Sequence, residues 1–421
     1  MERTQCCVVG GGPAGMVLGL LLARAGVEVT VLEKHKDFFR DFRGDTVHPP
    51  TLTLLDELGL GERFAELPSK RLEKMRMVIG DKTIVAADFS RVPGPHKYIS
   101  MVPQWDFLNL LAEAAAEEST FTLRMGAEVT GLRQGGGVRY LDSDGVEREL
   151  AASLVVGCDG RDSLVRAEAG LVPHEYDVPM DVWWVRVPKL EDTGKEAQVF
   201  GCFANGHAGV TMDRGDYYQT SYLIRKGQDE ALRAEGIEKF RERIGALFGW
   251  GQGELAAIRD WDDVKLLKVR MSKLPHWYSE RVLCIGDAAH AMSPVGGMGV
   301  NIAVQDAVAA ARILAAPLRS GTLTARDLGR VQRRRNVAVT LAQKQQLGEH
   351  KMLIEPALDG TLNERTIPLV LRISDRFPLL TGLGAFMGGI GPLREKPPVF
   401  ARRRPRVSSS SCGTCTRNYR N

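Results

Sequence analysis

The chain has 421 residues, of which 44% are hydrophobic and 26% are charged, a composition that gives a globular protein a full core and allows two domains. Its net charge of +4 comes from residues 401–421, which contain six arginines and no acid, so the rest of the chain carries a net charge of −2. This balance argues against nucleic acid as a partner of the main body, and the tail, rich in Arg and Ser, is predicted to be disordered.

The N-terminal segment is a predicted βαβ unit, with a strand over residues 5–9, a helix over 13–25 and a second strand over 27–32. A GxGxxG motif at residues 10–15 joins the first strand to the helix, and Glu33 follows the second strand. The glycines allow a tight turn, an approach to a pyrophosphate and close packing of helix on strand, while Glu33 can accept both hydroxyls of a ribose. The alternative, a structural turn rich in glycine, does not explain Glu33. The unit predicts dinucleotide binding by Gly10, Gly12, Pro13, Ala14, Gly15, Glu33 and Lys34.

The next elements are short helices over 51–58 and 104–118, followed by residues 120–150, which alternate like antiparallel strands. Residues 154–157 and 282–285 are continuous apolar runs, typical of strands buried on both faces of a central sheet. Both runs end in glycine and aspartate. Because ligands bind at the carboxyl ends of parallel strands, we expect these two loops and the GxGxxG loop to form one site.

A second, β-rich unit is predicted between those two runs. Residues 180–226 have the pattern of several strands with many aromatic side chains, and residues 229–248 are helical. The strand-like residues 74–89 are expected to join this unit, which would then be inserted into the first domain. A long helix over 299–318 closes that first domain.

The loop after residue 157 has the pattern DGxxSxxR, in which Ser163 can cap the following helix and Arg166 can meet a phosphate. A capped helix with a surface arginine is an equally good interpretation. The loop after residue 285 has the pattern GDAAHxxxPxxGxGxN. Here Asp287 can accept a sugar hydroxyl, and the turn into the long helix aims N–H groups at a negatively polarised ligand. We interpret His290 as part of the loop scaffold rather than as a base.

Together these three motifs, in this order, resemble the FAD-dependent aromatic hydroxylases of the para-hydroxybenzoate hydroxylase-like type, over about residues 4–320. Arg43 and Gln104 extend the resemblance, whereas Phe107 replaces the usual leucine. The resemblance implies an α/β fold, a Rossmann-like FAD-binding domain with an inserted β-rich substrate domain. It adds these predicted FAD contacts: Arg43, Gln104, Asp159, Gly160, Arg166, Gly286, Asp287, Pro294, Gly296, Gly299, Val300 and Asn301.

The implied domain organisation has the FAD-binding domain in three pieces and the substrate domain in two. The FAD-binding pieces are 1–73, 91–178 and 273–345, the substrate-domain pieces are 74–90 and 179–272, a helical segment covers 346–395, and a basic, disordered tail covers 396–421.

The resemblance also implies the reaction, in which NADH or NADPH reduces FAD and a flavin C4a-hydroperoxide hydroxylates an aromatic or polyketide-like small molecule of secondary metabolism. A second GxGxxG motif is missing from the sequence, so the nicotinamide cofactor is expected to bind only transiently. The catalytic base is not identified, and its candidates are His48, Arg186 and His207. Trp183, Trp184 and Tyr222 are candidate substrate contacts, although a place in the core of the sheet is as good an interpretation for each.

Two other functions stay open. One is a flavin-dependent halogenase, although the adjacent Trp183 and Trp184 differ from the Trp-x-Trp motif of that family. The other is a non-catalytic FAD-binding protein. Cysteines in apolar runs and the missing signal-peptide pattern indicate a reducing, cytoplasmic location. We expect a monomer or homodimer without a metal or a membrane span, since prolines and glycines interrupt the uncharged residues 377–393.

Overall fold

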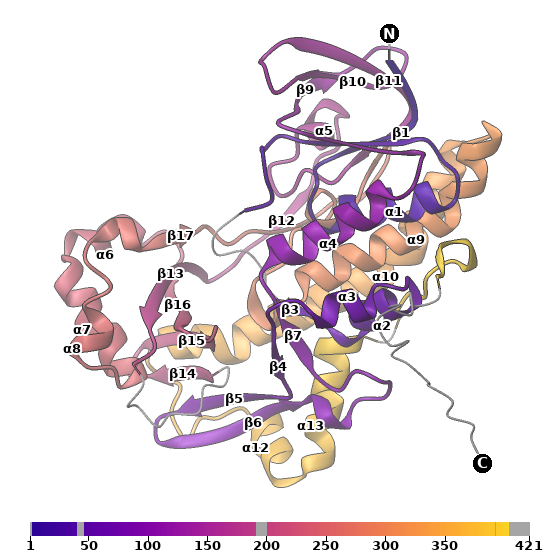
Figure 1. The fold of residues 1–421 in the computed structure, drawn as a ribbon. Coiled ribbons are helices and arrows are strands. Elements are labelled where there is room, and N and C mark those ends of the chain that lie inside the picture. The colour runs from indigo at the N-terminus through magenta and orange to yellow at the C-terminus, as the bar shows by residue number, and fades with distance from the viewer. Residues whose placement is uncertain (1, 40–45, 191–199, 392, 404–421) are drawn as a thin grey trace, which may run out of the picture.

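The computed structural model describes residues 2–39, 46–190, 200–391 and 393–403, and its strands form two large sheets in separate lobes (Figure 1). The first sheet has seven strands, in the order β8 (Phe121–Met125), β2 (Val29–Glu33), β1 (Glu2–Val9), β11 (Glu147–Gly157), β10 (Val138–Leu141) and β9 (Glu128–Leu132), with β19 (Val282–Cys284) also paired to β11. The helices of this lobe are α1 (Pro13–Arg24), α2 (Pro49–Glu57), α3 (Gly61–Ala65), α4 (Gln104–Ala116), α5 (Leu164–Glu168), α9 (Gly299–Ser320) and α10 (Ala325–Glu349).

The central strands of this sheet are parallel. Strand β1 pairs in parallel with both β2 and β11, and β11 pairs in parallel with β19, as the two apolar runs predict. The antiparallel prediction for the start of residues 120–150 is wrong, because β8 pairs in parallel with β2. Helix α4 precedes β8 and supplies the crossover that a parallel pair requires. Only β9 and β10 are antiparallel additions.

Helix α9 is the central helix of the first lobe and lies beside α1, with α4 on the other side of α1 (Figure 1). The residues Val295–Ser320, which include α9, are long and apolar enough to cross a membrane by length and composition. However, 78% of their most apolar stretch is buried inside the protein. Burial of this kind is expected of the core helix of a lobe, so the apolar sequence has a structural explanation.

The second sheet forms the other lobe. Its seven strands are, in order, β17 (Lys265–Leu267), β13 (Met180–Pro188), β16 (Tyr217–Arg225), β15 (His207–Asp213), β14 (Phe200–Ala204), β5 (Lys74–Ile79) and β6 (Lys82–Asp88). Strands from residues 74–89 thus join this sheet, as the sequence predicts. One face packs on α6 (Asp229–Ala234), α7 (Ile237–Phe248) and α8 (Gln252–Leu255), and the other face packs on the C-terminal segment and on Val295.

Two small sheets and a set of C-terminal helices complete the fold. The small sheets contain β3 (Thr46–Val47), β7 (Ile99–Met101) and β4 (Lys70–Leu72), and β12 (His174–Tyr176) with β18 (Met271–Lys273). The helices are α11 (Glu355–Leu358), α12 (Leu369–Arg376) and α13 (Pro378–Ala385), and π-helical turns cover His350–Ile354 and Phe386–Ile390.

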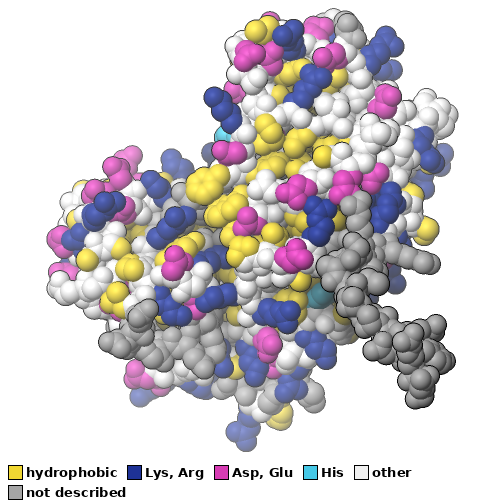
Figure 2. Space-filling model, viewed as in Figure 1, with side chains coloured by type: hydrophobic (Ala, Val, Ile, Leu, Met, Phe, Trp, Pro, Cys, Tyr) yellow, Lys and Arg dark blue, Asp and Glu magenta, His cyan; other side chains and the backbone are white. Residues whose placement is uncertain are grey.

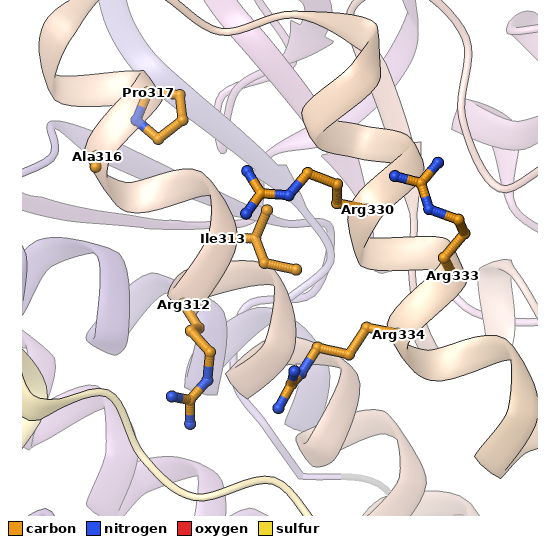
Figure 3. Close-up of a pocket in the computed structure, with 7 residues that line it drawn as sticks. All are labelled: Arg312, Ile313, Ala316, Pro317, Arg330, Arg333 and Arg334. Atoms are coloured by element: carbon orange, nitrogen blue, oxygen red, sulfur yellow. The ribbon is translucent and has the colours of Figure 1, made fainter.

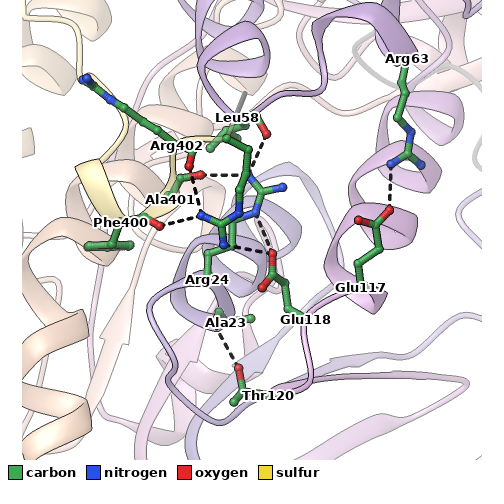
Figure 4. A network of polar contacts seen from close by, with 11 residues as sticks. Ala23, Arg24, Leu58, Arg63, Glu117, Glu118, Thr120, Phe400, Ala401 and Arg402 are labelled. Atoms are coloured by element: carbon green, nitrogen blue, oxygen red, sulfur yellow. Dashed lines mark hydrogen bonds and ion pairs between the residues drawn. The ribbon is translucent and has the colours of Figure 1, made fainter. Parts of the chain in front are cut away.

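The chain beyond residue 395 docks on the first lobe, which corrects the prediction of a disordered tail for residues 396–403. Arg24, whose side chain is 5% exposed, donates to the Ala401 carbonyl at 2.9 Å, and Ala401 is fully buried (Figure 4). Arg402 lies 3.2 Å from Glu57, and the Arg403 amide donates to the Glu57 carbonyl. Composition misses this docking because the buried Ala401, the carbonyls and the arginine ion pairs form no apolar periodic pattern in the sequence. Residues 404–421 lie outside the described part of the chain.

Deleting residues 396–421 is expected to lower the free energy of unfolding by about 1–2 kcal/mol, because the buried guanidinium of Arg24 loses a carbonyl partner. Deleting only residues 404–421 is the matched control, and we expect no change, since that segment has few apolar residues. Thermal unfolding of both truncations checks the prediction. Equal melting temperatures for the two truncated proteins would contradict it.

Candidate active site

The three predicted loops meet at the carboxyl ends of β1, β11 and β19. Gly10 has a φ of +102°, and a Cβ atom there would lie 2.4 Å from the Cys158 carbonyl oxygen, so the first two loops touch. Gly286 has a φ of +60°, and its Cβ would lie 3.4 Å from that of Ala14 and 3.3 Å from that of Ala303. The third loop therefore contacts both the first loop and α9. The approach at Gly10 leaves no room for a side chain, and the positive φ at Gly286 is a backbone conformation that favours glycine.

The first loop has the geometry of a phosphate-binding turn. A Cβ atom on Gly15 would lie 1.9 Å from the Gly10 carbonyl oxygen, which is the close packing that the motif predicts. In contrast, a Cβ atom on Gly12 would have no heavy atom within 4 Å, so open space lies at the start of α1. Glu33 is 9% exposed, and its carboxylate accepts from the amides of Gly11 at 2.8 Å and His35 at 3.0 Å. The predicted neighbour Lys34 is exposed.

Side chains of the second loop cap and position the helix that follows it, α5. The Ser163 hydroxyl accepts from the Arg166 amide at 3.0 Å, so the predicted cap is confirmed. The Asp159 carboxylate accepts from the Ser163 hydroxyl at 2.5 Å, and the Arg166 guanidinium donates to the carbonyls of Ala288 at 3.1 Å and Arg161 at 2.8 Å. Through these contacts Asp159 braces the second loop, and Arg166 links the second loop to the third.

The third loop is held by a buried carboxylate. Asp306 on α9 is fully buried and accepts from the Gly286 amide at 3.1 Å, from His290 Nε2 at 2.6 Å and from Arg335 Nε at 2.8 Å. Burial raises the pKa of Asp306, but the charges and hydrogen bonds of His290 and Arg335 outweigh it, and the net pKa lies below the usual range. His290 is 1% exposed and also packs against Trp277, which agrees with a scaffold role.

The start of α9 faces the same region. The first hydrogen bond of the helix runs from the Ile302 amide to the Met298 carbonyl. The amides of Gly299, Val300 and Asn301 precede it and point beyond the helix start, where they can bind a negatively polarised group. The Asn301 side chain is fixed by the Thr51 hydroxyl, which donates to it at 2.8 Å.

Helix α10 positions the loop before α9 through polar side chains that the sequence reading missed. Gln346 is fully buried and donates to the carbonyls of Ser293 at 2.9 Å and Val295 at 2.8 Å. The Ser293 hydroxyl lies 2.8 Å from His350 Nε2, and Gln343 donates to the Ala291 carbonyl at 3.2 Å. The signal is present in the sequence, because positions 343, 346 and 350 share one helix face on which polar residues replace the expected apolar ones.

The aromatic pair of β13 divides between the two faces of the second sheet. Trp183 is 1% exposed and Tyr222 is 4% exposed, and both pack with Phe240 of α7 on the helix-covered face. The structure thus places Trp183 and Tyr222 in the core between the second sheet and its covering helices, on the opposite face of the sheet from Val295 and the third loop. Trp184 lies on the opposite face, in the apolar cluster that also includes Val295. Of the three aromatic candidates, only Trp184 faces the first lobe.

The three candidates for the catalytic base lie in different places. His207 lies on the helix-covered face of the second sheet, where its Nδ1 is 2.6 Å from the Tyr222 hydroxyl, so the structure places it on the face away from the third loop. Arg186 is exposed and stacks on Tyr217 at 5.2 Å. His48 precedes α2 with Nδ1 3.3 Å from the Gly389 carbonyl, and burial lowers its pKa to about 4, so it is neutral at pH 7.

The remaining predicted residues surround the loops. Gln104 is the first residue of α4 and is half-buried, as is Asp287 in the third loop. Gly160 has a φ of +86° and open space at its Cβ position, whereas Pro294 is exposed and Gly296 has a φ of +77°. Arg43 lies outside the described residues.

A family model described as an FAD binding domain matches residues 3–344, which contain all three loops and α9. The chain belongs to the FAD-dependent aromatic hydroxylase family. The 6-methylpretetramide 4-monooxygenase of Streptomyces rimosus is 32% identical over 409 residues, which cover 96% of each chain. A 12-dehydrotetracycline 5-monooxygenase/anhydrotetracycline 6-monooxygenase of the same species is 28% identical and covers 96% of this chain and 80% of its own.

Among solved structures, the anhydrotetracycline hydroxylase OxyS from Streptomyces rimosus superposes with a TM-score of 0.72 at 24% identity, over 92% of this chain and 76% of that one. The fold is thus the para-hydroxybenzoate hydroxylase-like α/β fold that the sequence predicts. The family member described here is an FAD-dependent monooxygenase, and the comparisons favour this function over that of a halogenase.

Proposed function

We propose that this monooxygenase hydroxylates a ring carbon of a polycyclic aromatic polyketide of the tetracycline type. The observation that carries the proposal is the similarity to the 6-methylpretetramide 4-monooxygenase over 96% of both chains, which includes both lobes and therefore the face that would bind the substrate. NADH or NADPH serves as the electron donor, and a monomer or homodimer in the cytoplasm is proposed on sequence grounds.

In this proposal FAD lies extended across the three loops. Glu33 accepts the ribose hydroxyls at one end, and the open space at Gly12 takes the pyrophosphate beside the start of α1. Asp287 accepts a ribityl hydroxyl, and the free amides at the start of α9 face the pyrimidine edge of the flavin. Bound FAD supplies the redox chemistry with dioxygen, while the protein binds, orients and excludes water.

The substrate would bind between the loop that contains Val295 and the inner face of the second sheet. On this face Trp184 is half-buried and offers an aromatic surface to a flat molecule, whereas Leu223 and Phe203 are buried against the C-terminal segment. Figure 2 shows apolar side chains gathered where the two lobes meet. The proposed domain division follows, with residues 74–90 and 179–272 as the substrate domain.

His48 is the remaining candidate for moving a proton. It lies directly before α2, beside the 386–390 turn, and burial lowers its pKa to about 4, so the ring is neutral at pH 7 and its buried Nε2 can accept a hydrogen bond from a phenolic hydroxyl. The inner face of the second sheet does not offer another histidine among the described residues.

A substrate panel tests the proposed function. With FAD-loaded protein, NADPH and air, anhydrotetracycline is expected to raise the rate of NADPH oxidation at least about tenfold. A substrate that fits the site uses its binding energy to accelerate the reaction, whereas a compound that only binds does not. A monocyclic phenol, which fills less of the inner face, is expected to have little effect.

The outcomes separate the alternatives. Equal stimulation by the phenol and by anhydrotetracycline would contradict the polycyclic substrate class. Binding of anhydrotetracycline without stimulation by any aromatic compound would instead favour the non-catalytic FAD-binding protein.

A further inference from the structure

A basic cavity lies between α9 and α10, away from the three loops (Figure 3). It is a pocket of about 620 Å³ that is open to solvent, and its four arginines are exposed. Four of the seven lining side chains are arginines. The lining residues are Arg312, Ile313, Ala316, Pro317, Arg330, Arg333 and Arg334.

The cavity has more positive than negative charge. Glu395 binds Arg334 through two contacts of 2.7 and 2.9 Å and lies 3.8 Å from Arg312. Asp327 lies 3.3 Å from Arg330. Four guanidinium groups thus share two carboxylates, which leaves two positive charges uncompensated, and within the described ranges Arg333 forms no ion pair. An anion bound here would relieve the mutual repulsion of these groups.

The shape of the lining adds a second requirement on the ligand. Ile313, Ala316 and Pro317 form an apolar wall on α9, and Arg330 extends from α10 toward Ile313 (Figure 3). A planar guanidinium above an apolar wall suits an aromatic ring, since arginine stacks on flat rings as well as binding phosphate. The surplus of two charges matches a phosphomonoester, which carries roughly −1.5 to −2 at pH 7.

We propose that this cavity binds a nucleotide that carries a phosphomonoester. Such a phosphate could belong to the adenosine end of NADPH or to a separate nucleotide that acts as an effector. The cavity begins about 20 Å along α9 from Gly299, at 1.5 Å per residue, so it is distinct from the FAD loops. The binding claim does not depend on which aromatic compound the enzyme hydroxylates.

Titration calorimetry of the FAD-loaded protein with adenosine 2′,5′-bisphosphate tests the proposal. The double variant Arg330→Gln/Arg333→Gln removes the two arginines that do not bind Glu395, and it should weaken binding at least about tenfold, as expected for lost charge-assisted contacts. The control Arg326→Gln changes an exposed arginine of α10 outside the cavity and should bind like the unmodified protein. Adenosine, which lacks phosphate, should bind far more weakly.

Steady-state kinetics then identify the source of the phosphate. A KM that rises in the double variant for NADPH but not for NADH would assign the site to the 2′-phosphate of the donor. Unchanged KM values for both donors, together with lost binding of the bisphosphate, would assign it to a separate nucleotide. The proposal fails if the bisphosphate binds no more tightly than adenosine, or if the double variant binds it as well as the unmodified protein does.

Discussion

Replacing Asp306 with alanine is expected to lower the free energy of unfolding by about 3–5 kcal/mol, because removing one partner of a buried ion pair leaves an uncompensated charge. Asp306 is fully buried and is the shared partner of His290, Arg335 and the Gly286 amide. Its loss should therefore disturb the third loop and weaken FAD binding as well. Urea unfolding of the apoprotein, with flavin content measured in parallel, checks both effects.

Two variants make this test specific. Asp262→Ala removes an exposed carboxylate and should change stability by less than about 0.5 kcal/mol. Asp306→Asn keeps the shape of the side chain but removes its charge. The loss in free energy of unfolding relative to the unmodified protein should therefore depend on pH. Because the pKa of Asp306 is lowered on folding, its contribution is present above the unfolded pKa of about 4 and is lost as the pH falls through the folded value. A deficit that does not narrow on acidification would contradict the role of the charge.

Gly12→Ala is expected to weaken FAD binding by roughly ten- to a hundred-fold while lowering the stability of the apoprotein by no more than about 1 kcal/mol, the effect of replacing glycine at the N-cap of α1. The backbone of Gly12 has a φ of −72°, which alanine adopts freely, and the added methyl group would meet no protein atom within 4 Å. Only a ligand in that space would clash with it, and overpacking of this kind costs about 1–3 kcal/mol. Fluorescence titration with FAD and thermal unfolding of the apoprotein measure the two quantities.

Gly348→Ala is the matched control, since Gly348 lies inside α10 with no close neighbour in the way of a methyl group. Alanine is the better helix former, so this variant should be slightly more stable and should bind FAD normally. If Gly12→Ala binds FAD as tightly as Gly348→Ala, the pyrophosphate does not lie at the start of α1.

The loops of the FAD site were predictable because their chemistry is local. Gly15 is required by a backbone approach within one βαβ unit, and the two apolar runs carried enough pattern to predict a parallel pair, whereas the contact of Gly10 with Cys158 joins two loops. The contacts of the side chains were harder to predict, because their partners are distant in sequence. The guanidinium of Arg166 is chemically suited to bind phosphate. In the structure it donates to the carbonyl of Ala288, 122 residues away, a contact that the local sequence does not indicate.

The faces of the second sheet were predictable only in part. Strand alternation places Trp183 and Trp184 on opposite faces, but the sequence does not say which face α7 will cover. The docking of Ala401 was missed for a related reason, since a buried alanine and a carbonyl that binds Arg24 leave no pattern in composition.

The central claim, that this chain hydroxylates a polycyclic aromatic compound, is tested most directly by isotope incorporation. The FAD-loaded protein is incubated with NADPH, anhydrotetracycline and ¹⁸O₂, and the product is analysed by mass spectrometry. The account predicts a product with one added oxygen atom that carries the label from dioxygen, formed whether or not chloride or bromide is present. A halogenated product, an oxygen atom derived from water, or an unchanged substrate after NADPH is consumed would contradict it.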